Sequence, residues 1–410
     1  MMNLSLRTNH LKMITSLRGQ KTYNYLTIMN LHIDNDTCHE IIFTQGGVSH
    51  SLDKLYYNEH LVWQKLPPHD YSQDYFTIES REDNNSITLV ANGTPLSIRL
   101  YYSTDDGTTW SSYSEASSKQ WVLNTGDKIL FKANEYRYYK TSNDYWSFTG
   151  TKTHKVYGNI MSLLYGDNFI GQTSFPPDST YLSIYNFGSL FKNDAYLLDA
   201  SNLILYATTL TDCCYHSMFA NCTSLAKAPA LPATTLTEGC YGVMFGGCSS
   251  LTKAPALPAT TLAKLCYNSM FMNCTSLTEA PELQATTLAE KCYSLMFVNC
   301  SSLITAPVLP ATNLVIECYR EMFWACSSLT EAPELKATTL AEKCYYHMFR
   351  NCTSLKKIVC LATNISATQC VTGWVDGVYA TGDFYKAASM SSWTTGTDGI
   401  PSGWTVNNYS

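Results

Sequence analysis

The cysteines of this 410-residue chain recur with a fixed period of 26 residues. Seven of them form one register, and six more follow the first six members at an offset of eight residues. The first register is Cys214, Cys240, Cys266, Cys292, Cys318, Cys344 and Cys370, and the second is Cys222, Cys248, Cys274, Cys300, Cys326 and Cys352. A period of roughly 20–50 residues is typical of stacked units that bury their apolar sides against their neighbours. The pattern therefore predicts a stacked array over residues 188–372.

One repeat unit predicts a helix followed by an extended segment. Thr235 and Glu238 match a capping box at a helix N-terminus. Apolar residues then recur at helical steps of four and three: Leu236, Cys240, Met244, Cys248 and Leu251. The segment around Pro255 is too short for a second helix, and proline limits regular strand pairing. The fold class predicted for the array is an α/β solenoid.

The placement of the cysteines bears on their chemistry. We expect the thirteen registered thiols to line the interior, because free cysteine behaves as a small buried hydrophobe. Disulfides between adjacent units are an alternative, since stacked Cα atoms would lie about 5 Å apart. A zinc site is a third possibility, although two cysteines eight residues apart on one face cannot converge on one ion as zinc ligands do. We predict no metal and no cofactor, and Cys213, beside Cys214, is the more exposed thiol.

The repeat resembles the bacterial leucine-rich repeats of the BspA-like (Treponema-type) class. The matching residues in this chain are Met218-Phe219-Ala220-Asn221-Cys222-Thr223-Ser224-Leu225 and their five successors. The period of 26 is longer than is usual for that class, and Met replaces a small residue before Phe. The resemblance implies a leucine-rich repeat solenoid and a role in surface adhesion or host interaction, and related arrays occur in phages.

The segments around the array predict further modules. Alternating strands and the Asp-box pattern from Ser103 to Trp110 indicate a small all-β sandwich of immunoglobulin-like size with one self-capping turn. A sialidase propeller would need repeated blades. The predicted divisions are an undefined N-terminus (1–31), a short β-rich attachment module and linker (32–70), the sandwich (75–155), a connector (156–187), the solenoid (188–372) and an aromatic C-terminal cap (373–410).

The charge and hydropathy of the chain limit the classes of partner that we expect. The chain carries a formal charge of −6, and the array holds 11 Lys and Arg against 12 Asp and Glu. Nucleic-acid binding needs a basic stripe, which the array lacks. No stretch reaches the roughly 20 apolar residues that span a bilayer, and the N-terminus lacks the apolar core of a secretory signal. We predict neither nucleic-acid binding nor membrane insertion. The resemblance favours a bacterial surface or a phage virion, although no signal for export is visible.

Catalysis has little support in the sequence. No nucleophile elbow, zincin motif or phosphate loop is present. Glu282 and Glu334 lie two units apart, about 10 Å, which could suit an inverting glycosidase only within a cleft. We predict that the protein is not an enzyme, and a carbohydrate-active enzyme remains the minor alternative.

We call the equivalent positions of successive repeats a column. In a few columns the residue differs in nearly every copy, whereas in the others it hardly changes. The variable columns follow the Cys-Tyr and Met-Phe pairs, on the predicted outward side of each helix. Solvent-facing positions can drift in this way without any function. The alternative is a recognition face, since Trp, Tyr and Arg are enriched at binding hot spots. Its candidate partner-binding residues are Met272, Val298, Arg320, Glu321, Trp324, Tyr346, His347 and Arg350.

The extended segments offer a competing surface. On the concave side, through which leucine-rich repeats more often bind, lie Lys253, Glu279, Glu282, Glu331 and Glu334. The favoured hypothesis is a non-enzymatic adhesion or recognition protein that binds a protein or glycan on a host or neighbouring cell. A structural spacer in a surface or virion assembly is the second hypothesis.

Overall fold

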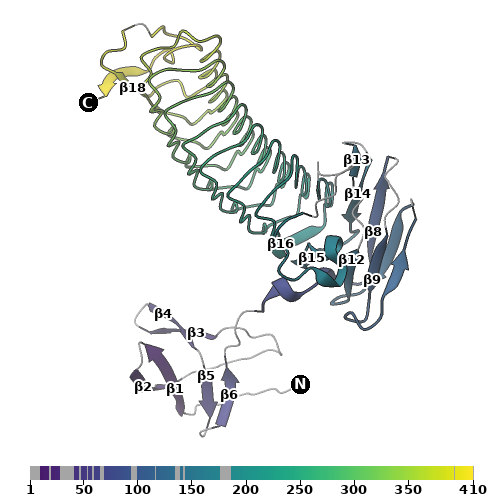
Figure 1. The fold of residues 1–410 in the computed structure, drawn as a ribbon. Helices are drawn as coiled ribbons and strands as arrows, with labels where there is room; N and C mark the ends of the chain where they lie inside the picture. Colours follow the sequence, from purple (N-terminus) through teal and green to yellow (C-terminus); the bar gives the residue numbers. More distant parts are fainter. Residues whose placement is uncertain are drawn as a thin grey trace. The chain divides into compact units, whose positions relative to one another are not determined.

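The structure is a computed structural model that divides into two compact units, Met1–Asp70 and Tyr71–Ser410 (Figure 1). It describes residues 10–17, 20–27, 41–45, 48–52, 54–57, 60–64, 69–93, 99–115, 117–133, 139–141, 144–175, 186–391 and 393–409. The six modules predicted from the sequence are a finer division than these two units, and that finer division stays a prediction.

The first unit contains short antiparallel strands. Four of them form a sheet in the order β2-β1-β5-β6, and two form a separate hairpin, β3-β4. The strands are β1 (His10–Leu17), β2 (Gln20–Thr27), β3 (Ile41–Gln45), β4 (Val48–Leu52), β5 (Lys54–Tyr57) and β6 (His60–Gln64). β1 and β2 lie in the N-terminal segment that the sequence left undefined, and β1 pairs with β5 of the next predicted module.

The second unit begins with two packed sheets. One has the strand order β10-β9-β12-β7-β15-β16, and the other has the order β11-β8-β14-β13. The strands are β7 (Phe76–Ser80), β8 (Asn85–Asn92), β9 (Leu100–Ser103), β10 (Ser111–Tyr113), β11 (Lys119–Leu123), β12 (Lys128–Ala133), β13 (Tyr139–Thr141), β14 (Asp144–Thr149), β15 (His154–Asn159) and β16 (Leu197–Ile204). Among the described strands of these two sheets, β15 and β16 are the one pair that runs in parallel.

Aromatic side chains from the two sheets meet in the core between them. The Phe131 ring on β12 lies 4.8 Å from that of Phe148 on β14 and 5.4 Å from that of Trp121 on β11. Alternate residues of β8 and β12 are buried, as expected for strands with one face on a core. The predicted strands of this region are present wherever the structure describes it.

The first sheet continues into the repeat region. β15 pairs with β16, and Asp199 of β16 forms a parallel bridge with Lys227 of the next repeat. Each copy of the repeat is called a winding. The imidazole Nε2 of His154 lies 2.9 Å from a carboxylate oxygen of Asp194, and both side chains are almost completely buried. Short helices lie near this junction: η1 (Tyr71–Gln73), α1 (Ser162–Tyr165) and η2 (Gly166–Asn168).

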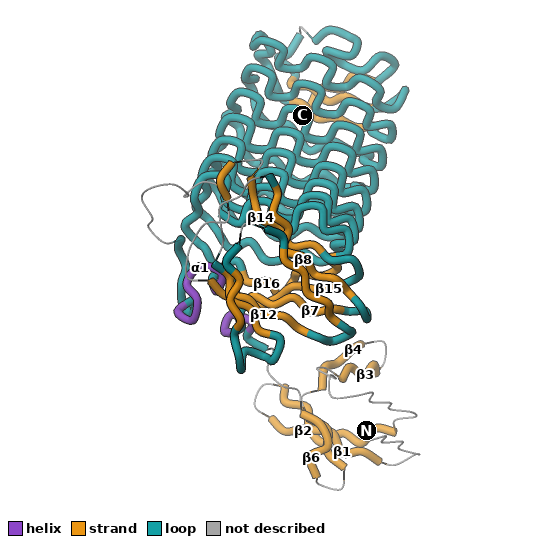
Figure 2. The backbone as a smooth tube through the Cα atoms, turned by 90° about the vertical axis from the view of Figure 1, so that its right-hand side faces the viewer, coloured by secondary structure: helices purple, strands orange, loops and turns teal. Residues whose placement is uncertain are grey.

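The prediction of an α/β solenoid is wrong. In the part of the chain that the structure describes, α1 is the one α-helix, and it lies before the repeats. The repeats instead form windings of consecutive turns and isolated parallel bridges (Figure 2). The predicted capping residue Thr235 bridges Thr209 of the preceding winding and starts no helix. The described protein is therefore almost entirely β-strand and turn.

The backbone hydrogen bonds explain why no helix forms. The amides of Ala220 and Cys222 donate to carbonyls three residues earlier, as in successive β-turns. The amides of Phe219 and Asn221 donate to Met244 and Gly246 of the next winding, at 2.9 and 2.7 Å. In this turn segment every second amide thus bonds to an adjacent winding, whereas an α-helix would satisfy nearly all of its amides internally. The spacing of four suits both arrangements, because either one turns the same side chains inward.

This path requires left-handed backbone conformations, which cost about 1–2 kcal/mol for ordinary residues and little for Gly or Asn. One column of the repeat has positive φ in every winding, between 58° and 79°. Its members are Asn221, Gly247, Asn273, Asn299, Ala325, Asn351 and Gly377. Asn side chains also bond along the column, with Asn299 donating to Asn273 at 2.9 Å. The Asn and Gly residues were the sequence signal for turns, and the helical interpretation overlooked it.

Identical side chains stack through the interior of the windings. The Phe rings of Phe191, Phe219, Phe245, Phe271, Phe297, Phe323 and Phe349 lie 5.2 to 5.8 Å apart and nearly parallel. A second ladder contains the Tyr rings from Tyr215 to Tyr345. All thirteen registered cysteines are buried and free, and Cys213 is partly exposed. Cys274 donates its S–H to the carbonyl of Phe245 at 3.1 Å, and the other second-register thiols do likewise.

A parallel sheet and large aromatic residues close the C-terminal end. The sheet has the order β17-β18-β19, with β17 (Lys357–Cys360), β18 (Asp383–Ala387) and β19 (Thr405–Tyr409). The Trp374 ring stacks 6.2 Å from Tyr345, the last Tyr of its ladder, and 5.6 Å from Trp393 on its other side. These rings cover the end of the ladder.

Candidate functional site

The stacking places the variable columns in line. The amides of Asn273, Asn299 and Ala325 donate to the carbonyls of Val298, Trp324 and Arg350 at 2.7 to 2.8 Å. Because each bond joins equivalent points of adjacent windings, Met272, Val298, Trp324 and Arg350 follow one another along the stack. Sequence reasoning placed these residues on helices, and the structure places them on turns. Their common alignment survives that correction, since it depends on the period alone.

Arg320 is the centre of a charged cluster on this variable face. Its guanidinium lies 3.1 Å from a carboxylate oxygen of Glu317 and 2.8 Å from one of Glu321. It also lies 5.4 Å from the ring centre of Tyr346 in the next winding. The side chains of Glu317 and Glu321 are largely buried, whereas Arg320 is about one-third exposed. The two carboxylates hold the guanidinium in place, and the Tyr346 ring covers it.

Trp324 and Arg350 form a second pair beside the first. The Arg350 guanidinium lies 5.8 Å from the Trp324 ring centre and 3.2 Å from a carboxylate oxygen of Asp376. The ring of His347 is 6.5 Å from Trp324 and 3.9 Å from Tyr346, so it connects the two pairs. Burial and the charge of Arg350 lower the pKa of His347, which keeps the ring neutral at neutral pH.

The structure therefore brings together six of the eight candidate partner-binding residues. Trp324, Tyr346 and His347 are partly exposed, as a recognition face requires. Val298, expected at the exposed apolar centre, is buried at 7 % exposure, and Glu321 is buried at 6 %. Val298 therefore offers a partner almost no surface, and Glu321 fixes Arg320. Met272 lies two windings away and is partly exposed.

The competing face consists of the extended segments. Most of its charged residues follow one another along the stack of windings. Lys253 bridges Glu279, Glu279 bridges Thr305, and Glu331 bridges Lys357. Glu282 and Glu334 lie three residues after Glu279 and Glu331. Between these pairs, the apolar side chains of Ile304 and Val308 are 55 % and 68 % exposed.

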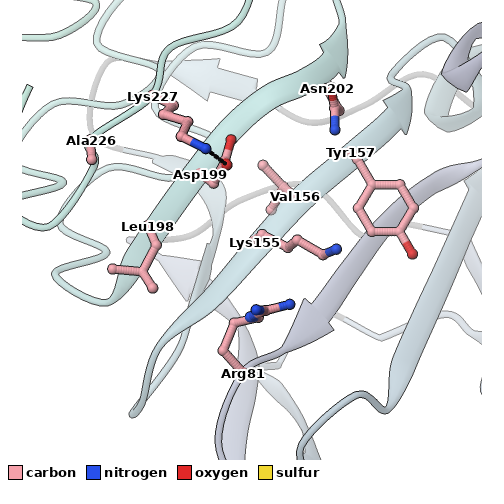
Figure 3. Close-up of a pocket in the computed structure, with 9 residues that line it drawn as sticks. All are labelled: Arg81, Lys155, Val156, Tyr157, Leu198, Asp199, Asn202, Ala226 and Lys227. Carbon is pink, nitrogen blue, oxygen red and sulfur yellow. Dashed lines mark ion pairs between the residues drawn. The ribbon is translucent and has the colours of Figure 1, made fainter. Parts of the chain in front are cut away.

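A pocket of about 410 Å³ lies at the sandwich end of this face (Figure 3). Lys155 and Arg81 share one carboxylate, that of Glu79, at 3.0 and 3.5 Å, and Lys227 pairs with Asp199 at 3.2 Å. Figure 3 shows Arg81 and Lys155 directed into the same space. Three cations and one carboxylate, that of Asp199, thus line the pocket. It is lined by Arg81, Lys155, Val156, Tyr157, Leu198, Asp199, Asn202, Ala226 and Lys227.

The Asp-box pattern forms the self-capping turn that was predicted. Asp105 accepts hydrogen bonds from the amide of Thr109 at 2.9 Å and from its hydroxyl at 2.6 Å. Ser103 accepts from the amide of Gly107 at 2.9 Å. Hydrogen bonds from Thr109 and Ser103 lower the pKa of Asp105 to about 2. Trp110 packs beneath Lys132, whose ammonium lies 4.1 Å from the ring centre. These contacts give the motif a structural role.

Sequence reasoning missed three residues of the variable face. Glu317 and Asp376 anchor the two arginines, but each differs from the residues in its column and gave no repeated signal. Gly373 has a φ of 58° and lies against the imidazole of His347, where a Cβ atom would come within 2.4 Å of the ring. Gly373 thus makes room for the His347 ring. The other members of its column, among them Val243 and Leu295, have positive φ without being glycine, so the residue type gave no signal for this conformation.

The described residues hold neither a metal-binding cluster nor a membrane-spanning helix. They contain no group of three or more His, Cys, Asp or Glu side chains arranged to hold a metal ion. Within the same residues, no helix has the length and apolar character needed to cross a membrane. Comparison of the chain with family models, curated proteins and solved structures gave no match.

Proposed function

We propose that this protein is a non-enzymatic recognition protein that binds a protein or glycan partner through the variable face of its windings. One observation carries the proposal: Arg320, Trp324, Tyr346, His347 and Arg350 form one partly exposed cluster at positions where the residue differs from copy to copy. At the positions of Trp324 and Tyr346, for example, the second copy has Gly246 and Gly242.

The chemistry of the cluster supports recognition. Trp and Tyr present large rigid surfaces at a low cost in conformational entropy, and both are enriched with Arg at binding hot spots. The ion pairs to Glu317 and Asp376 fix the two guanidinium groups before a ligand arrives. A prearranged surface loses less entropy on binding than a mobile one. Random drift of solvent-facing positions would not require these anchors.

The test compares binding of the full-length protein with that of two matched double variants. Trp324→Ala with Tyr346→Ala removes the aromatic cluster. The control, His216→Ala with Asn268→Ala, changes the column of Tyr346 in two earlier windings and leaves every candidate partner-binding residue intact. We expect the wild type and the control to bind at least one probe on a printed array of glycans and extracellular protein domains. The aromatic double variant should lose at least tenfold in affinity.

Two results would contradict the proposal. If the aromatic double variant binds as the wild type does, the variable face is not the binding surface. If the wild type binds no probe of either class, the second hypothesis of a structural spacer is favoured. Arg320 is left unchanged in this test because its removal would leave the buried carboxylate of Glu321 without its ion pair and that of Glu317 with Lys291 at 3.8 Å, which destabilises proteins.

A further inference from the structure

A second groove lies at the C-terminal end of the extended face, away from the variable face. Its volume is about 550 Å³, within the range of ligand pockets. Two carboxylates, one ammonium group and two phenol rings line it: Glu331, Glu334, Lys357, Tyr385 and Tyr409. β18, which carries Tyr385, is labelled in Figure 1.

The register of the parallel strands assembles this groove. Glu331 bridges Lys357 at the start of β17, and two residues later Val359 pairs with Tyr385 on β18. Successive side chains of a strand point to opposite faces, so Lys357 and Val359 lie on the same face as Glu331 and Tyr385. Tyr409, near the end of β19, is 41 % exposed and completes the wall. The groove therefore has a firm floor of paired strands.

The charges in the groove are not balanced. The ammonium of Lys357 lies 3.0 Å from a carboxylate oxygen of Glu331, so these two groups neutralise each other. Glu334 accepts a hydrogen bond from the hydroxyl of Tyr409 at 3.1 Å and makes no ion pair with any described residue. One negative charge is left over. The bond to Glu334 raises the pKa of Tyr409, as expected beside an uncompensated carboxylate.

We propose that this groove binds an organic cation, either an alkylammonium or a guanidinium group. The Glu334 carboxylate would accept its hydrogen bonds, and charge-assisted bonds of this kind are stronger than neutral ones. The rings of Tyr385 and Tyr409 would contribute cation–π attraction, which strengthens when the cation is desolvated in a groove. Val359 offers apolar contact for the carbon chain that carries the charge. The proposal does not depend on the variable face.

The experiment uses calorimetric titration of the full-length protein at low ionic strength. The probes are the N-acetyl methylamides of lysine, arginine and norleucine, of which norleucine has no charge. We expect the lysine and arginine probes to bind and the norleucine probe to bind at least tenfold more weakly. Binding should weaken as salt is added, because the interaction is electrostatic. Equal binding of norleucine and lysine would overturn the proposal.

Variants locate the site. Glu334→Gln should weaken binding of the cationic probes at least fivefold, and Tyr385→Leu should weaken it similarly while Tyr385→Phe, which keeps the ring, should not. The matched control is Glu282→Gln, in the same column as Glu334 two windings earlier and outside the groove. If Glu334→Gln and Glu282→Gln have the same effect, the ligand is not held in the groove and the proposal fails.

Two further arms identify the source of the cation and separate this proposal from the previous one. Spermidine and a lysine-containing tetrapeptide are compared with the single-residue probe. Tighter binding of spermidine would indicate a free amine, and tighter binding of the peptide would indicate a protein partner; either result supports a cation site. The Trp324→Ala with Tyr346→Ala variant should bind all cationic probes normally. Failure of one proposal can therefore be recognised without failure of the other.

Discussion

The sandwich and the windings both bury aromatic side chains, but the rings pack against different kinds of neighbours in the two regions. In the sandwich, Phe131 contacts Phe148 and Trp121, which come from other strands and share no pattern with it. In the windings, Phe271 contacts its own equivalents, Phe245 and Phe297, at 5.7 and 5.8 Å. The core of the sandwich therefore comes from the alternation of buried and exposed residues along each strand. The core of the windings comes from identical residues that stack on one another in successive windings. In a repeat region, stability is a sum of nearest-neighbour contacts, so damage should stay local.

The largest expected effect tests this difference directly. Phe271→Ala and Phe131→Ala should each lower the free energy of unfolding by about 3–5 kcal/mol, because each removes a fully buried ring. Hydrogen exchange should rise only in the windings next to residue 271, whereas the Phe131 variant should expose amides throughout both sheets. Loss of protection in the sandwich of the Phe271 variant would show that the two regions unfold as one.

The second prediction concerns the junction between the regions. Burial opposes charge on His154, but the nearby Asp194 carboxylate and the carbonyl of Lys152 raise its pKa above the usual value of 6.5. A raised pKa means that the pair stabilises the fold fully below pH 6.5 and loses this contribution as pH rises through the folded pKa. Asp194→Asn should cost about 3 kcal/mol at low pH.

The sign of the pH dependence is the measurement that checks this prediction. Above pH 6.5 the wild type should become less stable as the pH rises. In Asp194→Asn the carbonyl of Lys152 still favours the charged ring, but burial is the largest effect and lowers the pKa of His154, so stability should instead fall as the pH drops below 6.5. Denaturant unfolding between pH 5 and pH 8 separates the two slopes. Parallel slopes in both proteins would contradict the assignment.

A smaller effect is expected in the thiol ladder. Cys274→Ala removes a buried sulfur and its hydrogen bond to Phe245, and should cost about 1–2 kcal/mol. Cys213→Ala changes a partly exposed thiol and should stay within about 0.5 kcal/mol. Equal losses from the two substitutions, measured by denaturant unfolding, would contradict a structural role for the registered thiols.

The smallest effect should be a gain in stability. Ala325 has a φ of 59° in a column otherwise made of Asn and Gly. Ala325→Asn should stabilise the protein by about 0.5–1 kcal/mol, because Asn tolerates this conformation better and can bond along the column. Ala325→Val, which adds a branched side chain at the same φ, should destabilise it. Thermal unfolding of the two variants gives the comparison, and a loss of stability in Ala325→Asn would contradict the turn geometry.

The sequence predicts that the residues of the candidate site lie in line along the windings. It does not predict which side chains they contact. The period alone placed Trp324, Tyr346 and Arg350 near one another, because equivalent residues of adjacent windings must stack. It could not tell that Val298 is buried or that Glu317 and Asp376 hold the arginines, since those facts depend on side-chain packing. Both pockets were missed because each combines residues that are distant in the sequence.

The amino-acid sequence determined the 26-residue period, the burial of the registered cysteines and the self-capping turn, since each follows from spacing or local hydrogen bonding. The tertiary structure decided the path of the backbone. A spacing of four is compatible with a helix and with consecutive turns, and the choice depends on where the amide hydrogens find acceptors. In this protein alternate amides find them in the next winding, and a single repeat considered alone contains no such partner.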